Sequence, residues 1–290
     1  MPNTKKVAVI GGSGLYQMSG VEFIQHHNVN TPYGATSAPI AQCAIEGMDV
    51  ELYFVPRHGI GHTLNPSEVP YRANIFALKS LGVEWVISVS AVGSLKEEIV
   101  PGHVVIIDQF IDRTKGREST FFDNGIIAHI PFGDPICETL RNILLESSQE
   151  SDATFHDGGT YVCMEGPAFS TRAESNLYRS WGASVIGMTN IPEAKLAREA
   201  ELSYATLAMA TDYDCWHEGH DDVTVDQVIK TINSNVTLAQ DIIRRSIPKI
   251  LAHSETPPQQ GILEFAFITN KSKIPSQRVK DLAPIIGKYF

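Results

Sequence analysis

The regular alternation of short β-branched runs with amphipathic stretches is the feature that most restricts how this chain can fold. The runs typical of strands are 7–10, 50–55, 85–89, 103–107, 161–164, 184–188 and 204–210. The stretches with helical spacing are 71–81, 135–150, 172–181, 192–201 and 225–251. Several strand runs are apolar on both faces, as in a sheet covered on each side. The pattern therefore predicts an α/β fold with a central, mainly parallel or mixed sheet flanked by helices.

The number of domains follows from length and from one polar segment. With 290 residues, of which 43% are hydrophobic, the chain can bury the core of one large domain. Residues 253–261 are polar and contain two consecutive prolines, which is typical of a linker. We therefore expect a single domain over 1–252. A linker and C-terminal tail over 253–290 would dock on the same or a neighbouring subunit.

Charge and cysteine usage exclude several classes of partner. The formal net charge is -10 without a compensating Lys/Arg cluster, so we expect no nucleic acid and no anionic membrane as partner. No window reaches the roughly 18 apolar residues of a spanning helix, and residues 1–6 lack a leader pattern, so we expect a cytoplasmic protein. Four dispersed cysteines and two histidines only three apart, at 217 and 220, predict no metal site. A small molecule fits best.

Donor-rich loops follow three of the predicted strands. Residues 11–14 are Gly-Gly-Ser-Gly, in which amides and Ser13 suit a phosphate, although the dinucleotide fingerprint fails at Gln17 and no P-loop lysine follows. Arg57 adds a planar fork of donors and His58 another donor. Ser90 lies among small residues at 88–94. Each loop alone is as consistent with a tight bend or a surface pair, but together they predict an oxyanion pocket.

Three further strand ends carry groups suited to a ring, to an anion and to proton transfer. Asp212 and Asp214 end the last apolar run, where paired carboxylates favour acid–base work, although alone they are equally typical of a cap or solvated turn. Thr189 extends the anion site, while Met188 is more often a core residue than a contact. A Gly-Pro turn could present Phe169 as an aromatic wall, with core packing the equal alternative. No Gly-x-Ser-x-Gly elbow supports a serine hydrolase.

These motifs, in this order and spacing, resemble those of the 5'-methylthioadenosine phosphorylases in the trimeric purine nucleoside phosphorylase superfamily. The matching segments are 11–15, 56–59, 108–114, 165–167, 171–175 and 210–216, within a resemblance that covers roughly residues 5 to 250. The resemblance implies a single domain with a partly barrel-like sheet. It also implies phosphorolysis of 5'-methylthioadenosine in methionine and purine salvage, with weaker activity on adenosine.

The resemblance also assigns residues to parts of the reactants. It implies that phosphate, the co-substrate of an enzyme without cofactor, is held by Ser13, Arg57, His58, Ser90, Ala91 and Thr189. It implies that the nucleoside is held by Met188, Phe169, Ser170, Val225, Asp212 and Asp214, and that His129 reaches the 5' pocket of a neighbouring subunit. The implied assembly is a homotrimer, or a hexamer made of two.

The implied mechanism follows from the chemistry of the bond. An N-glycosidic bond breaks toward a cationic sugar and a poor anionic leaving group, so an acid must protonate the purine at N7 while an anion lies beneath C1'. Protonated Asp212 would supply the proton, and phosphate would act as the nucleophile. A carboxyl beside C6 also favours an amino group over a 6-oxo group. The methylthio pocket needs only apolar walls such as Val225.

Two other functions are compatible with the sequence, and a few positions differ from the family pattern. A 6-oxopurine or methylthioinosine phosphorylase is the nearest rival, and a catalytically inactive nucleoside-binding protein is another. Ala168 stands where the family usually has arginine, and we expect its loss to loosen the loop that carries Phe169 and Ser170. Asn190-Ile191 replaces the more frequent Thr-Val. The tail matches the family poorly. We expect Leu282 and Ile285 in it to help to close a neighbour's methylthio pocket.

Overall fold

The computed structural model describes residues 4–12, 14–15, 18–217 and 225–290, with the backbone alone at 225–230 and 232–234. The strands are β1 (Lys5–Gly11), β2 (Val21–His27), β3 (Ile40–Ile45), β4 (Met48–Pro56), β5 (Trp85–Ser94), β6 (Val104–Ile106), β7 (Gln109–Arg113), β8 (Phe155–Asp157), β9 (Thr160–Met164), β10 (Val185–Gly187) and β11 (Ser203–Asp212). The helices are α1 (Tyr71–Ser80), α2 (Glu138–Gln149), α3 (Arg172–Ser180), α4 (Asn190–Glu199), α5 (Val225–Ala252), α6 (Ser276–Asp281) and α7 (Ala283–Ile286), with short 3₁₀ turns at Lys271–Lys273 and Gly287–Tyr289.

The sheet branches at β5, the strand that positions the site. Its first half pairs in parallel with β1 over 85–88, while β11 pairs with it in parallel from Trp85 to Gly93. Its second half continues past the end of the β1 pairing and meets β10 antiparallel at Ser94. We expected this strand to end at residue 89 in a loop. That prediction was wrong, because the small residues that follow still form ladder bonds to β11.

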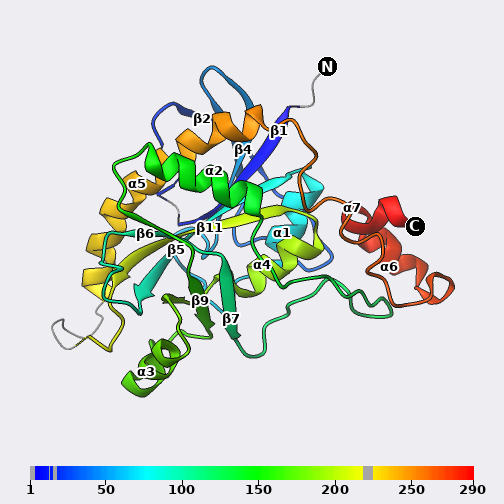
Figure 1. The fold of residues 1–290 in the computed structure, drawn as a ribbon. Coiled ribbons are helices and arrows are strands. Elements are labelled where there is room, and N and C mark those ends of the chain that lie inside the picture. The colour runs from blue at the N-terminus through cyan, green and yellow to red at the C-terminus, as the bar shows by residue number, and fades with distance from the viewer. Residues whose placement is uncertain (1–3, 13, 16–17, 218–224) are drawn as a thin grey trace.

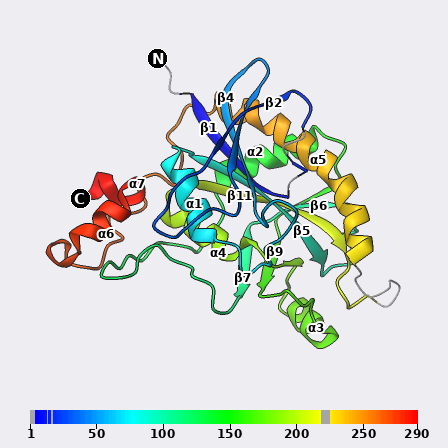
Figure 2. The same cartoon turned by 180° about the vertical axis from the view of Figure 1, so that it is seen from behind.

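Helices cover both faces of this mixed sheet, as the alternating pattern predicted. Helix α2 lies in front of the strands in Figure 1, whereas α1 and α4 lie in front in Figure 2. The apolar residues of β11 explain this arrangement, because nine of its ten residues are buried and α2, α4 and α5 all pack on it. A strand covered on both faces reads as a continuous apolar run rather than an alternating one.

Four strands were missing from the sequence prediction. β2 lies at the edge of the sheet beside β3, and five of its seven residues are exposed. It therefore lacks the apolar signal that marks the central strands. β3 has only six residues, and the chain enters β4 almost at once. β7 and β8 are short. β7 pairs with β9, and β8 pairs with β6; in each pair the partner residues are 51 positions apart in the sequence.

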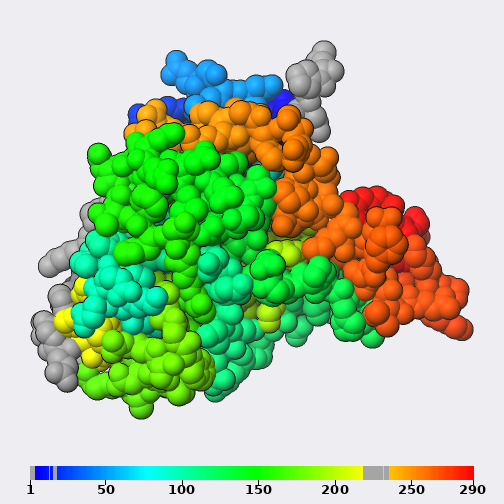
Figure 3. All heavy atoms as spheres, viewed as in Figure 1, coloured from blue at the N-terminus to red at the C-terminus, as the bar shows by residue number. Residues whose placement is uncertain are grey.

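An extended arm (residues 114–134) and the C-terminal tail lie side by side at one end of the molecule (Figures 1 and 3). Ala128 bridges Phe267, and the amide of Ile268 donates to the carbonyl of Ile127 at 2.9 Å. Arg278 donates to the carbonyl of Phe121 at 2.9 Å. The tail is thus tied to the arm of its own chain by backbone and side-chain bonds.

The tail also contributes to the core of its own chain. Leu282 and Ile285 are 0% and 1% exposed and belong to the main core cluster. Glu201, itself buried, accepts bonds from the amides of Gly261 and Leu263 at 3.0 and 3.1 Å and pairs with Lys288. The expectation that Leu282 and Ile285 close a neighbour's pocket was therefore wrong. Their apolar side chains are already used to seat the tail.

Candidate active site

A cavity of about 990 Å³ opens where β1 and β5 part, and it gathers most of the predicted site residues. Its volume is in the range of pockets that bind a nucleoside-sized ligand. Nine of the predicted residues line it, namely Arg57, His58, Ser90, Ala91, Phe169, Met188, Thr189, Asp212 and Asp214. They come from within β5 and from the carboxyl ends of β4, β9, β10 and β11. The prediction that these loops converge on one pocket is therefore in accord with the geometry, while the role of each residue stays a prediction.

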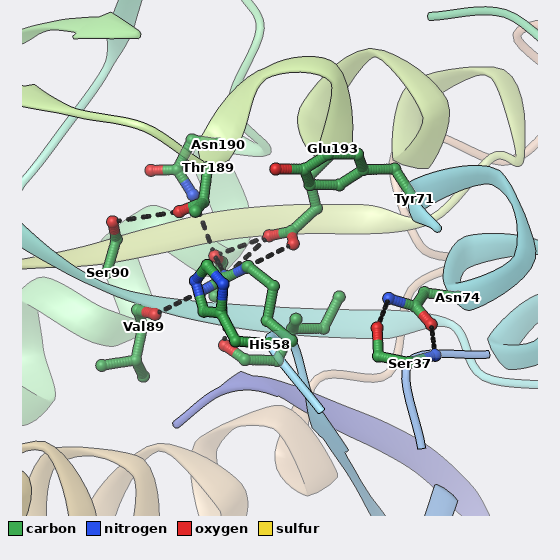
Figure 4. A network of polar contacts seen from close by, with 12 residues as sticks. Ser37, His58, Tyr71, Asn74, Val89, Ser90, Thr189, Asn190 and Glu193 are labelled. Carbon is green, nitrogen blue, oxygen red and sulfur yellow. Dashed lines mark hydrogen bonds and ion pairs between the residues drawn. The ribbon is translucent and has the colours of Figure 1, made fainter. Parts of the chain in front are cut away.

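Hydroxyl groups line one side of the cavity. The Oγ atom of Ser90 lies 3.4 Å from the Oγ1 atom of Thr189 (Figure 4). The same Oγ atom lies 3.1 Å from the hydroxyl of Tyr161. Ala91 is exposed to the cavity beside Ser90. A tetrahedral anion binds where several donors converge in this way. This half of the cavity therefore suits phosphate.

Arg57 is held beneath these hydroxyls by an ion pair with Glu193. Its Nε and Nη2 atoms donate to the two carboxylate oxygens of Glu193 at 2.7 and 2.9 Å, and Nη1 donates to the carbonyl of Val89 at 3.0 Å (Figure 4). Burial would lower the pKa of Arg57, but the charge and bonds of Glu193 raise it above its ordinary value. The fork of Arg57 thus faces Glu193, and one Nη1–H has no partner among the described residues.

Three more side chains complete the environment of Glu193. Ser88 and Tyr204 each donate a hydroxyl to Glu193 at 2.8 Å. Asn190 donates its amide hydrogens to Ser88 at 3.0 Å and to Tyr204 at 2.8 Å. Glu193 is only 2% exposed, and these bonds satisfy a carboxyl that burial has removed from water. Asn190 donates two hydrogen bonds here, whereas the hydroxyl of a threonine at this position has only one hydrogen to donate.

The two aspartates form the opposite side of the cavity. The register between β11 and β5 shifts between Ala210 and Asp212, which is a β-bulge of the kind that re-aims a side chain. Asp212 accepts from the amide of Asp214 at 2.8 Å and from the hydroxyl of Thr211 at 2.7 Å. Gly93 faces the pair, and a Cβ there would lie 2.9 Å from an oxygen of Asp212. The close packing keeps water from most of both carboxyls.

Burial is the main electrostatic influence on this pair. It raises the pKa of Asp212, against the opposing effect of the bonds from Thr211 and Asp214. It also raises the pKa of Asp214, to which the charge of Asp212 adds. A carboxyl with a raised pKa holds its proton at a higher pH than a solvated aspartate does. The pair is therefore suited to general acid chemistry.

The loop that carries Phe169 is held from both ends. Thr171 and Glu174 form a reciprocal capping box at the start of α3. On the other side, Arg117 donates to the carbonyls of Glu165 and Met188, both at 2.6 Å. Arg117 thus ties the Phe169 loop to the Met188 segment. The loop has these supports although Ala168 replaces the usual arginine.

Two predicted residues do not line the cavity, and two more lie outside what the structure describes. Ser170 is buried beside it, where the thiol of Cys215 donates to its carbonyl at 3.2 Å. His129 is exposed on the arm, away from its own chain's cavity. Ser13 and the side chain of Val225 lie outside the described residues. The roles expected for all four stay predictions.

Sequence reasoning missed Arg117 and most of the network around Arg57. Glu193 lies in the first turn of α4, and nothing in the sequence indicates that it meets Arg57, 136 residues away. Tyr204 was hidden within an apolar run. A buried strand run that contains a tyrosine is a usable signal, because a buried phenol needs a polar partner.

We found no group of three or more metal-binding side chains in the part of the chain that is described. The helices described there include none long and apolar enough to cross a membrane.

Comparison with known proteins identifies the family of this chain. The sequence model of the phosphorylase superfamily matches residues 6–248. The chain belongs to the phosphorylase superfamily. It is 57% identical over 284 residues to the S-methyl-5'-thioadenosine phosphorylase of Geobacter sulfurreducens, with 98% of each chain covered. It is 53% identical over 285 residues to that of Chloroflexus aurantiacus, again with 98% of each covered. These alignments include most of the tail, which the sequence motifs had left outside the resemblance.

Solved structures of the same superfamily have the same fold. A methylthioadenosine phosphorylase from an Antarctic soil metagenomic library superposes with a TM-score of 0.92 at 45% identity, covering 98% of this chain and 99% of that one. A variant of the adenosine/methylthioadenosine phosphorylase of Schistosoma mansoni, in complex with methylthioadenosine, gives 0.80 at 36% identity, covering 86% and 93%. The predicted fold class and the family resemblance are confirmed.

Proposed function

We propose that this protein catalyses the phosphorolysis of 5'-methylthioadenosine to adenine and 5-methylthioribose 1-phosphate. The observation that carries the proposal is the pairing, in one cavity, of two buried carboxyls with a cluster of anion donors. The relatives named above carry this activity in their names, and one of the structures holds methylthioadenosine. The enzyme would thus be a pentosyltransferase of methionine and purine salvage.

The proposed chemistry uses each half of the cavity differently. Asp212 donates a proton to N7 as the bond to C1' lengthens, so that adenine leaves as a neutral base. Phosphate, held by Ser90, Thr189 and the second Nη1–H of Arg57, stabilises the developing cation and then bonds to C1'. No protein nucleophile and no cofactor is required, because phosphate is the co-substrate.

Selection of the nucleoside follows from the same groups. Asp212 and Asp214 offer carboxyl oxygens to the amino group at C6, whereas a 6-oxo group would bring two acceptors together. Met188 would contact the ribose, and Phe169 would contact the base. Ser170 and Val225 would affect specificity, including specificity for the 5' group. An apolar 5' pocket excludes a hydroxyl only weakly, which predicts adenosine as a poorer substrate.

The proposed assembly is a homotrimer or a pair of trimers, in which His129 of each arm completes the 5' pocket of its neighbour. An exposed apolar cluster on the arm and tail supports such an interface. Its members are Ile127, Phe265, Ile268 and Phe290, with exposed fractions of 51%, 91%, 65% and 41%. A cluster of this kind is costly to leave in water and is typical of a binding surface.

The direct test is adenine release from 5'-methylthioadenosine, with and without phosphate. We expect release only when phosphate is present. The same assay with methylthioinosine distinguishes the 6-oxopurine phosphorylase, and we expect that substrate to be turned over much more slowly. Release without phosphate would indicate a hydrolase, and binding without release would indicate a nucleoside-binding protein. Either result would overturn the proposal.

A further inference from the structure

The phosphate half of the cavity offers an anion little net positive charge. Arg57 and Glu193 lie 2.7 Å apart, and their side chains are 3% and 2% exposed. A buried pair at this distance has opposite charges that nearly cancel for a third group nearby. Arg57 therefore contributes a single N–H donor to the cavity rather than a free cation. The binding of an anion must depend on individual hydrogen bonds.

His58 is a second basic residue that lines this side of the cavity, and one bond fixes where its proton lies. Its Nδ1 atom is 2.9 Å from the carbonyl oxygen of Leu64. A carbonyl only accepts, so Nδ1 carries the hydrogen. The amide of Leu64 in turn donates to the carbonyl of His58 at 3.0 Å, which holds the ring in this orientation. The ring of His62 stacks on it at 4.2 Å.

The charge of His58 then decides what its second nitrogen can do. Burial, followed by the neighbouring Arg57, lowers the pKa of His58 to about 4. The ring is therefore neutral near pH 7, and a neutral imidazole with its hydrogen on Nδ1 has a bare lone pair on Nε2. His58 lines the cavity, and Nε2 has no partner among the described residues. The anion site thus contains an acceptor beside its donors.

We propose that His58 is a specificity-determining residue, whose Nε2 accepts a hydrogen bond from the hydroxyl of hydrogen phosphate and so selects a protonated oxyanion over sulfate. The inference rests on the proposed function in taking phosphate as the co-substrate. Hydrogen phosphate and hydrogen arsenate both carry a hydroxyl near neutral pH. Sulfate has the same shape and the charge of the phosphate dianion but has no hydrogen to donate.

The expected selectivity follows from this mismatch. In the phosphate complex the hydroxyl of the anion donates to Nε2, while Ser90, Thr189 and Arg57 donate to its other oxygens. In a sulfate complex an anionic oxygen faces the lone pair of Nε2, so one bond is lost and repulsion replaces it. We expect sulfate to bind at least about tenfold more weakly than phosphate.

Calorimetric titration of the full-length protein with phosphate, arsenate and sulfate near neutral pH tests the inference without turnover. The expected order is phosphate and arsenate similar, with sulfate at least about tenfold weaker. Equal binding of phosphate and sulfate by the unaltered protein would overturn the inference without the need for any variant. Turnover is measured separately. Phosphate-dependent adenine release combined with equal anion binding would leave the proposed function intact and reject only the role of His58.

His58→Leu then separates an acceptor from a donor. Loss of the acceptor should weaken phosphate and leave sulfate unchanged or tighter, so the ratio of the two dissociation constants approaches one. If His58 instead donates to the anion, both anions weaken together and the ratio stays as before, which contradicts the inference. His62→Leu is the matched control, because it removes the neighbouring imidazole of the stack. It should leave the ratio of phosphate to sulfate binding unchanged.

Discussion

At the scale of single residues, the proposed chemistry depends most on Asp212, because its protonated carboxyl is the group assigned to N7. The β-bulge at Thr211 turns it into the cavity, and burial raises its pKa. Asp214 lies two residues further on with φ of 53°. This left-handed backbone brings a second carboxyl to the same wall.

Asp212→Asn should lower kcat with 5'-methylthioadenosine at least about 100-fold, because an amide cannot transfer a proton to N7. The same change should favour methylthioinosine in relative terms, since the amide can donate to a 6-oxo group. The measurement is kcat/KM for both nucleosides. Asp49→Asn, at an exposed position, is the control and should change neither value. An unaltered preference for the 6-amino base in Asp212→Asn would sink the assignment.

Some residues of the site could be predicted from the sequence, and others could not. Asp212, Arg57 and Thr189 were predictable because each directly follows a run that reads as a strand, and strand ends meet at one edge of a sheet. Glu193 was not predictable as a partner. Its bond to Arg57 depends on how α4 packs against the sheet, and no local pattern encodes that distance.

At the scale of elements, α4 connects the site to the arm. Its first turn carries Glu193, beneath Arg57, and its last residue, Glu199, accepts from the amide of Phe121 at 2.6 Å and the hydroxyl of Thr120 at 2.7 Å. Burial raises the pKa of Glu199 to about 7, against those two bonds. One helix thus supports the phosphate half of the cavity at one end and the arm at the other.

The raised pKa of Glu199 predicts a pH-dependent stability. Between its ordinary pKa of 4.5 and about 7, the unfolded chain has lost this proton while the folded chain keeps it. The free energy of unfolding should therefore fall as pH rises through that window, by up to about 3 kcal/mol from this group. Glu199→Gln, which cannot ionise, should remove this part of the slope in denaturant titrations between about pH 5 and about pH 8.

The matched control for Glu199 is Glu46→Gln, an exposed glutamate, which should keep the slope of the unaltered protein. A Glu199→Gln variant with the same slope would show that Glu199 ionises normally.

Comparing the strands shows why some of them could not be predicted from the sequence. The central strands were predictable because burial on both faces demands continuous apolar runs. β2 was not, because it is an exposed edge strand, and the second half of β5 was not, because small polar residues there suggest a loop. Their pairing is fixed by neighbours in the sheet rather than by their own composition.

At the scale of the whole molecule, the arm and tail decide whether one chain is sufficient. The tail is anchored to its own chain by Glu201 and Arg278, yet it leaves Phe265 and Ile268 in water. His129 lies on the arm beside this cluster and away from its own cavity. If His129 of a neighbouring chain completes each site, only the assembled protein can turn over its substrate.

The double substitution Phe265→Lys and Ile268→Lys should therefore break the assembly, because charged side chains resist burial in an interface. Light scattering should report a smaller particle, and turnover of 5'-methylthioadenosine should fall with it while phosphate binding persists. Phe23→Lys, at an exposed position of the edge strand β2, is the control and should leave the particle intact. A variant of unchanged size, or a monomer of unchanged activity, would contradict the proposed trimer.

In the proposed reaction, phosphate itself attacks C1' while the acidic pair releases adenine. Turnover of 5'-methylthioadenosine in ¹⁸O-labelled phosphate, with the sugar product examined by ³¹P NMR and mass spectrometry, tests this most directly. The account predicts 5-methylthioribose 1-phosphate that retains all of the label, including the oxygen that bridges phosphorus and C1'. Free 5-methylthioribose without label would show that water is the nucleophile and would contradict the account.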